Sequence, residues 1–145
     1  MSDEKHFSVN IEHLEDYQFK VEFEKESMGT ILTDETEDVG GGARGPPPSR
    51  LLAAATLNCL MASLIFCLSK KRVGYEALKG EIEGTVDRVD GRWRVTTLDV
   101  DITLNIDEED KKKLDKCLDI FEDYCIVTQS VTNGIDVNVN VEPEV

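Results

Sequence analysis

The chain has 145 residues, of which 40% are hydrophobic and 32% are charged, and this composition suits one small soluble domain with a modest core. Its 30 acidic residues outnumber its 16 basic residues and give a net charge of -14 at pH 7. A surface of that charge repels phosphate backbones and anionic lipids, so the composition argues against a nucleic-acid-binding protein and against docking on a membrane.

The beginning of the chain has no secretory signal pattern, because residues 1–5 lead into an alternating polar stretch and not into an apolar segment. We therefore expect a cytoplasmic protein. In that compartment cysteines are usually reduced, and they serve in catalysis or fill the core more often than they form a disulfide framework. The four cysteines to which this applies are Cys59, Cys67, Cys117 and Cys125.

The first third of the chain is expected to form β-strands. Apolar and polar residues alternate over residues 7–11 and again over residues 19–23, which is the pattern of a half-buried strand. Residues 28–33 are expected to form a third strand.

A flexible segment follows, acidic over residues 34–38 and then rich in glycine and proline. Gly40, Gly42 and Gly45 formally satisfy the spacing G-x-G-x-x-G. A dinucleotide-binding turn opens directly into a helix, whereas here three prolines (residues 46–48) intervene. The segment is therefore predicted to be a loop, and no nucleotide cofactor is expected.

A long helix is predicted from Ser49, which can cap it, to about Lys70. It is apolar nearly all round, and its length alone makes it a borderline transmembrane candidate. Polar Thr56, Asn58 and Ser63 and the high alanine content make membrane insertion unfavourable. A helix that is apolar on every side is better placed at the centre of a core or of a dimer.

The second half of the chain is expected to contain a hairpin, a helix and a last strand. Strands over residues 82–89 and 98–106 flank Asp90-Gly91, a dipeptide favoured in tight turns. Apolar residues then follow a helical stripe from Asp107 to about Cys125. After a turn at Asn133-Gly134, residues 135–141 alternate as in a half-buried strand.

A cysteine thiol becomes a nucleophile only as a thiolate, which needs a nearby cation, base or helix N-terminus. Cys59 lies deep inside its helix and far from the helix N-terminus, so a cation that activates it would have to come from another segment. Taken alone, a cysteine in an apolar helix is more often an inert core residue. Cys67 and Cys117 lie in apolar stripes and are interpreted as small core residues. Cys125 falls at a helix end, where a thiol can move, as a resolving cysteine must. The candidate cations are Arg44, Arg50, Arg92 and Arg94.

Metal binding and hydrolysis are the other chemistries that these residues could suggest. The cysteines form two pairs with a spacing of eight, whereas structural zinc prefers ligands two to four residues apart. No metal is expected. The serines lack any nucleophile-elbow motif, so hydrolase chemistry has no support.

Two segments resemble the OsmC/Ohr (osmotically inducible protein C, organic hydroperoxide resistance) family. Residues 48–59 are similar to the start of that family's long central helix: a proline, apolar and small residues, and then the peroxidatic cysteine, here Cys59. Residues 117–127 are similar to the helix end that bears the second cysteine, commonly Cys-Pro-Val, with Ile126 here in place of the proline. The strands before, between and after these segments also follow the family's order.

The resemblance implies one OsmC-like domain over residues 1–145, with an α+β fold of antiparallel sheets and two main helices. The first helix would be long and central, and two copies would form an intertwined homodimer. It also implies that Cys59 attacks an organic hydroperoxide and becomes a sulfenic acid, that Cys125 closes a disulfide, and that a dithiol reductant reopens it. No cofactor is implied.

One departure from the family concerns activation of the thiolate. Peroxidase members carry a glutamate nine or ten residues before the first cysteine, paired with an arginine from the N-terminal region. Here those positions hold Ser49 and Arg50, and no arginine precedes Arg44. Arg50 is the candidate to supply the positive charge directly. The alternative is a non-catalytic protein of the same fold that binds an apolar small molecule at the dimer interface.

Overall fold

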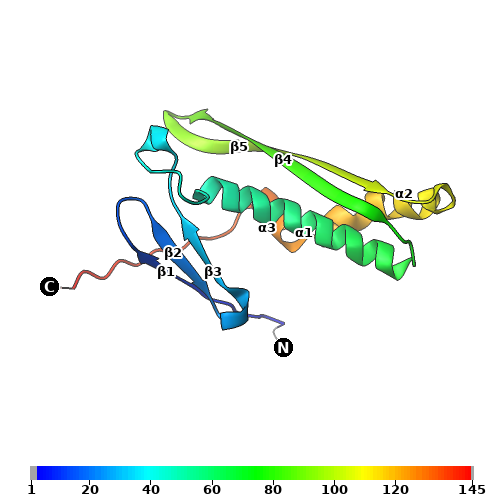
Figure 1. Ribbon diagram of the computed structural model, residues 1–145, viewed down its shortest axis with the longest axis horizontal. Helices are drawn as coiled ribbons and strands as arrows, with labels where there is room; N and C mark the ends of the chain where they lie inside the picture. The colour runs from blue at the N-terminus through cyan, green and yellow to red at the C-terminus, as the bar shows by residue number, and fades with distance from the viewer. Residues whose placement is uncertain (1–2, 145) are drawn as a thin grey trace. The chain divides into compact units, whose positions relative to one another are not determined.

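The computed structural model describes residues 3–144 (Figure 1). The chain forms two compact units, residues 1–52 and residues 53–145. The single domain expected over residues 1–145 is a prediction that this grouping leaves untested, and the two units are taken in turn.

The first unit is an antiparallel sheet of three strands in the order β1-β2-β3. Val21 in the central strand lies opposite Ile11 and Ile31 and is buried. The predicted second strand is confirmed, the first begins two residues later than expected, and the third is shorter because a 3-10 turn occupies its expected start. The elements of this unit are β1 (Val9–His13), β2 (Phe19–Phe23), the turn η1 (Glu26–Met28), β3 (Thr30–Thr33) and the turn η2 (Glu37–Val39).

The glycine-rich segment after β3 is organised around the buried carboxylate of Asp34. This carboxylate accepts hydrogen bonds from the backbone N–H groups of Glu35 (2.7 Å), Gly42 (3.1 Å) and Arg44 (3.1 Å). Burial would raise the pKa of Asp34, but these hydrogen bonds outweigh it and lower the pKa below its usual value. A side chain at Gly41 would overlap the backbone carbonyl of Glu35. A side chain at Gly45 would likewise overlap the backbone carbonyl of Leu32, so both glycines have a local structural reason that involves no nucleotide.

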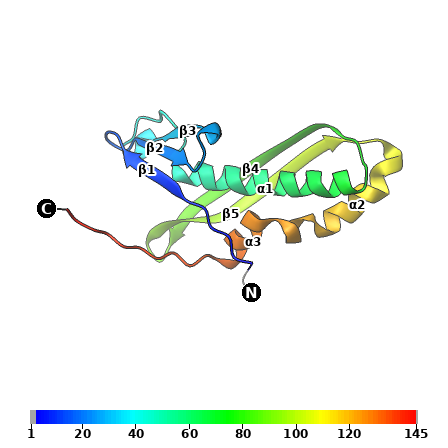
Figure 2. The same ribbon diagram turned by 90° about the horizontal axis from the view of Figure 1, so that it is seen from below.

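The second unit consists of a long helix, a long hairpin and two shorter helices. Asp90 and Gly91 both have positive φ, 53° and 81°, as the two-residue turn of a hairpin requires, so the predicted turn is confirmed. Figure 2 shows α1 running along the hairpin, with α2 and α3 returning antiparallel beside it. The elements are α1 (Pro48–Lys70), whose first turn belongs to the first unit, β4 (Glu76–Val89), β5 (Arg92–Asn105), α2 (Lys111–Ile120), α3 (Ile126–Asn133) and the 3-10 turns η3 (Glu108–Asp110) and η4 (Phe121–Tyr124).

The core of the second unit lies along one face of α1. Thr56, Leu60, Leu64 and Leu68 are buried, and their spacing of four places them in one stripe on the helix. This stripe packs against apolar side chains of the hairpin and of α2 and η4. These are Leu78, Val100, Ile102, Leu104, Ile106, Leu114, Cys117 and Phe121.

Two expectations about the end of the chain are wrong. The helix predicted from Asp107 to Cys125 is divided: α2 ends at Ile120, where φ is -126°, and Cys125 is extended before α3 begins. The apolar stripe continued through this break, which is why periodicity alone did not reveal it. Residues 135–141 form no strand, and their apolar side chains are exposed, because no other strand of the described chain pairs with them.

Candidate functional site

The two cysteines proposed as the working pair lie against each other in the second unit. Cys59 projects from the middle of α1 and is half buried, whereas Cys125 lies between η4 and α3 and is fully buried. Both are free thiols, and their side chains are in hydrogen-bond contact. The fold thus brings together two sulfurs that are 66 positions apart in the sequence.

Several groups stabilise negative charge on Cys125. Its Sγ lies 2.9 Å from Oγ1 of Thr128, at the N-terminus of α3. Burial raises the pKa of the Cys125 thiol, but hydrogen bonds from Cys59, from the hydroxyl and backbone N–H of Thr128 and from Ser63 outweigh burial and lower it. Cys125 is therefore the better thiolate of the pair.

Cys59 has the opposite tendency. Burial raises the pKa of its thiol, and the hydrogen bond to Cys125 raises it further. When the pair loses one proton, the negative charge therefore lies mainly on Cys125 and the remaining proton on Cys59. The sequence did not reveal this division, because the groups that stabilise Cys125 come from α1 and α3. Two thiols in such contact titrate as one unit.

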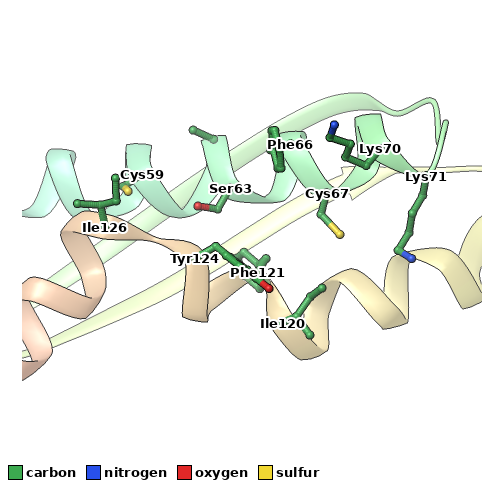
Figure 3. A pocket seen from close by; sticks show the side chains of 11 residues that line it. Cys59, Ser63, Phe66, Cys67, Lys70, Lys71, Ile120, Phe121, Tyr124 and Ile126 are labelled. Carbon is green, nitrogen blue, oxygen red and sulfur yellow. The ribbon is translucent and has the colours of Figure 1, made fainter. Parts of the chain in front are cut away.

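Cys59 opens on an apolar pocket of about 780 Å³. Figure 3 shows the pocket between α1 on one side and α2 with η4 on the other. Cys125 is not among the lining residues, so a molecule in the pocket meets Cys59 first. The lining residues are Cys59, Ala62, Ser63, Phe66, Cys67, Lys70, Lys71, Ile120, Phe121, Tyr124 and Ile126.

The third predicted site residue, Arg50, lies nine residues before Cys59 on α1. That spacing is two and a half helical turns, which places the two residues on opposite sides of the helix and about 13 Å apart along it. The Arg50 guanidinium donates a hydrogen bond to Oγ of Ser49 at 3.0 Å. The backbone N–H of Arg44 donates to Asp34, and Arg94 donates to the Trp93 carbonyl oxygen. No arginine is among the main groups that shift the pKa of either free thiol.

The expectation that Cys67 and Cys117 are separate reduced core residues is wrong. They form a disulfide that joins α1 to α2, with their Cα atoms 5.7 Å apart. A signal for this pairing is present in the sequence. The residue numbers of the pairs Cys59/Cys125 and Cys67/Cys117 add to the same total, as expected when two antiparallel segments place residues opposite each other. The equal spacing of eight is thus explained by two opposed antiparallel segments and not by a zinc pattern.

Metal-ligating side chains are not grouped in this structure. Within residues 3–144, no three His, Cys, Asp or Glu side chains lie close enough to hold a metal ion. The two histidines have other partners: Nε2 of His13 lies 2.8 Å from the Asp16 carbonyl oxygen, and Nε2 of His6 lies 3.3 Å from the Glu4 carboxylate.

Comparison with models of known protein families shows to which family the chain belongs. The family model described as OsmC-like protein matches residues 40–140. The chain belongs to the OsmC-like protein family. No curated protein matches it in sequence.

Solved structures agree with this assignment at the level of the fold. An OsmC-like protein of unknown function from Vibrio cholerae superposes with a TM-score of 0.76 at 15% identity, covering 88% of this chain and 94% of that one. An OsmC-like protein from Mycoplasma pneumoniae has a TM-score of 0.73 at 14% identity, covering 90% and 89%. An organic hydroperoxide resistance protein OsmC from Legionella pneumophila has a TM-score of 0.64 at 12% identity, covering 88% and 89%.

These matches confirm the predicted α+β OsmC-like fold with antiparallel sheets and a long central helix. They also place α1 in context. By length and composition α1 could cross a membrane, and 22% of its most apolar stretch is buried within the chain. In an OsmC-like protein it is the central helix of the fold.

Proposed function

We propose that the chain is a thiol-dependent peroxidase that reduces organic hydroperoxides through Cys59 and Cys125. The observation that carries this proposal is the contact between two free thiols, one of which opens on an apolar pocket. Two structural neighbours are named organic hydroperoxide resistance proteins, which supports the same reading.

The first step begins with a proton transfer within the pair. In the singly deprotonated pair Cys125 holds the negative charge but is fully buried, whereas Cys59 faces the pocket. Passing the Cys59 proton to Cys125 forms the Cys59 thiolate where the substrate can meet it. This thiolate attacks one peroxide oxygen, the O–O bond breaks, and the alkoxide leaves and takes up a proton from Cys125 to become an alcohol. Cys59 is then a sulfenic acid.

The second step uses the thiolate that remains on Cys125. It attacks the sulfur of the Cys59 sulfenic acid, a disulfide forms, and hydroxide leaves. One hydroperoxide has then been reduced to an alcohol while the two thiols have been oxidised. A dithiol reductant supplies the two electrons and two protons that restore Cys59 and Cys125.

Arg50 is proposed to supply positive charge to this site. Because it lies on the side of its own helix opposite to Cys59, we expect it to act through a second copy of the chain. We further propose a cytoplasmic homodimer without a nucleic-acid or membrane partner.

The experiment that tests the proposal is intact-mass spectrometry after one equivalent of cumene hydroperoxide. The unmodified protein should lose two hydrogens as Cys59 and Cys125 join. Cys125→Ser should gain one oxygen, or two on further oxidation, and Cys59→Ser should remain largely unreacted. A matched control is Cys67→Ser/Cys117→Ser, which removes the other pair and should still react. Equal consumption of hydroperoxide by Cys59→Ser and the unmodified protein would refute the proposal.

The second candidate is a non-catalytic protein that binds an apolar small molecule. The observation that favours it is the raised pKa of Cys59, since a protonated thiol is a poor nucleophile. Such a protein would bind an apolar ligand in the pocket while Cys59 reacted with an alkylating agent no faster than a free cysteine. A peroxidase should show faster alkylation of Cys59 at neutral pH.

A further inference from the structure

The proton of Cys125 has to travel from a buried sulfur to an oxygen in the pocket. Cys125 is fully buried and does not line the pocket, whereas the leaving alkoxide forms beside Cys59, which does. An alkoxide is a strong base, so the O–O bond breaks slowly unless a proton arrives as the oxygen leaves. A group that contacts both Cys125 and the pocket is therefore needed.

Ser63 is in the position that this group must occupy. It follows Cys59 by four residues on α1, about one helical turn, so the two side chains lie on the same face of the helix. Ser63 is half buried and lines the pocket. Figure 3 shows its hydroxyl on the side of α1 that faces Tyr124, in the same row as Cys59. The side chain of Ser63 also forms a hydrogen bond with Cys125. One hydroxyl thus connects the buried sulfur with the pocket.

The other proton-bearing side chains near the pair lack one of these two contacts. Oγ1 of Thr128 lies 2.9 Å from the Cys125 sulfur, but Thr128 does not line the pocket. Tyr124 lines the pocket, but it is 73% exposed and is not among the main groups that shift the pKa of Cys125. The two lysines of the pocket lie at the end remote from Cys59 (Figure 3). The contacts therefore favour Ser63.

We propose that Ser63 is a catalytic residue that passes the proton of Cys125 to the oxygen that leaves the peroxide. A serine hydroxyl accepts one hydrogen bond while it donates another. As the O–O bond breaks, the hydroxyl proton of Ser63 goes to the alkoxide, and the proton of Cys125 replaces it on Oγ. Ser63 ends unchanged, Cys59 is a sulfenic acid, and Cys125 is the thiolate that closes the disulfide. This inference rests on the proposed peroxidase function and adds its proton donor.

Two oxidants with different leaving groups test this role. Cumene hydroperoxide releases an alkoxide, which needs a proton, whereas 3-chloroperoxybenzoic acid releases a carboxylate, which does not. The rate at which each oxidises Cys59 is measured by rapid quenching and intact-mass spectrometry. Ser63→Ala should lower the ratio of the cumene hydroperoxide rate to the peracid rate by on the order of tenfold or more. Alanine is the best helix former, so the variant should keep the fold of α1.

The ratio separates proton delivery from the other effect of Ser63. Loss of its hydrogen bond to Cys125 also raises the pKa of that thiol, which changes the rates with both oxidants alike. Thr128→Val is the matched control, because it removes another hydroxyl from the same sulfur without altering the pocket wall. It should change both rates by the same factor and keep the ratio. Ser63→Thr retains a hydroxyl, and Tyr124→Phe removes the other hydroxyl of the pocket; both should keep the ratio.

The outcomes distinguish this inference from the proposed function. If the unmodified protein oxidises Cys59 rapidly with both oxidants and Ser63→Ala leaves the ratio unchanged, only the inference fails. An equal fall of the ratio in Ser63→Ala and Thr128→Val would also overturn it, because the effect would then come from the hydrogen bonding of Cys125. If neither oxidant reacts with Cys59 faster than with free cysteine, the proposed function fails and the role of Ser63 fails with it.

Discussion

At Cys125, hydrogen bonds offset the effect of burial on the pKa of the thiol. A fully buried thiol is normally protonated, yet the hydrogen-bond donors of Cys59, Ser63 and Thr128 converge on this one sulfur. Each donor favours the thiolate, so the buried sulfur acquires the lower pKa of the pair. Half-buried Cys59 correspondingly has the higher pKa of the two thiols.

The hydroxyl of Thr128 offers a direct test of this arrangement. Thr128→Val keeps the shape of the side chain but removes the oxygen that lies 2.9 Å from the Cys125 sulfur. The pKa of Cys125 should rise, so its thiolate should form at a higher pH, and its closing of the disulfide with oxidised Cys59 at neutral pH should slow several-fold. Thiolate absorbance at 240 nm, followed as a function of pH, measures the shift.

Thr128→Ser is the matched control, because it restores the hydroxyl and should leave the midpoint of the titration near that of the unmodified protein. An unchanged midpoint in Thr128→Val would show that the hydroxyl does not stabilise the thiolate.

At the scale of elements, the Cys67–Cys117 disulfide fixes α2 against α1. The same two elements carry the opposite walls of the pocket, and η4 after α2 leads directly to Cys125. The disulfide therefore holds the register in which Cys125 lies against Cys59. It is a structural link between helices and is separate from the pair of free thiols, Cys59 and Cys125.

Removing this link should lower the stability of the protein. The two cysteines are 50 positions apart, and closing a loop of that length restricts the unfolded chain by about 4 kcal/mol in the chain-entropy model. Cys67→Ser/Cys117→Ser should therefore unfold at a lower denaturant concentration, with a loss approaching that value. Urea denaturation followed by circular dichroism makes the measurement.

Reduction provides the control for the side-chain replacement. The unmodified protein treated with dithiothreitol should lose a similar amount of stability, while the double variant should be insensitive to the reductant. Equal midpoints for the oxidised, reduced and variant proteins would show that the disulfide contributes nothing to the free energy of unfolding.

The sequence predicted those elements whose signals are local. The alternation at residues 19–23, the turn at Asp90–Gly91 and the apolar run of α1 each gave the observed element, because one short stretch contains the whole pattern. The break between α2 and α3 escaped prediction, since buried Cys117, Phe121 and Cys125 keep a helical spacing across it. Periodicity reports which side chains are buried and not whether the backbone between them stays helical.

The two free thiols of the candidate site were predictable, whereas their electrostatics and the position of Arg50 were not. Resemblance to the family identified Cys59 and Cys125, and the fold places them in contact. The division of charge between them depends on Ser63 and Thr128, which no pattern singled out. The disulfide was missed for a similar reason. A cytoplasmic setting argued for free thiols, and only the antiparallel packing of α1 and α2 brings Cys67 to Cys117.

At the scale of the whole molecule, one chain leaves apolar surface uncovered in the second unit. Only one stripe of α1 is buried, and Phe66 on another side of that helix is 65% exposed. Ile126 beside the pocket is 80% exposed. The alternating apolar side chains of residues 135–141 are also exposed, although their pattern is that of a half-buried strand. Large exposed apolar patches of this kind mark an interface.

We therefore predict a homodimer in which a second copy covers α1 and supplies a partner for residues 135–141. Light scattering at micromolar concentration should give twice the chain mass of 16.2 kDa. Phe66→Glu places a charge in the apolar surface and should shift the protein toward the monomer, because burying an unpaired charge is costly. Phe66→Leu keeps an apolar side chain and should remain dimeric. A monomeric mass for the unmodified protein would contradict the prediction, and it would leave the exposed face of α1 without the partner that its sequence requires.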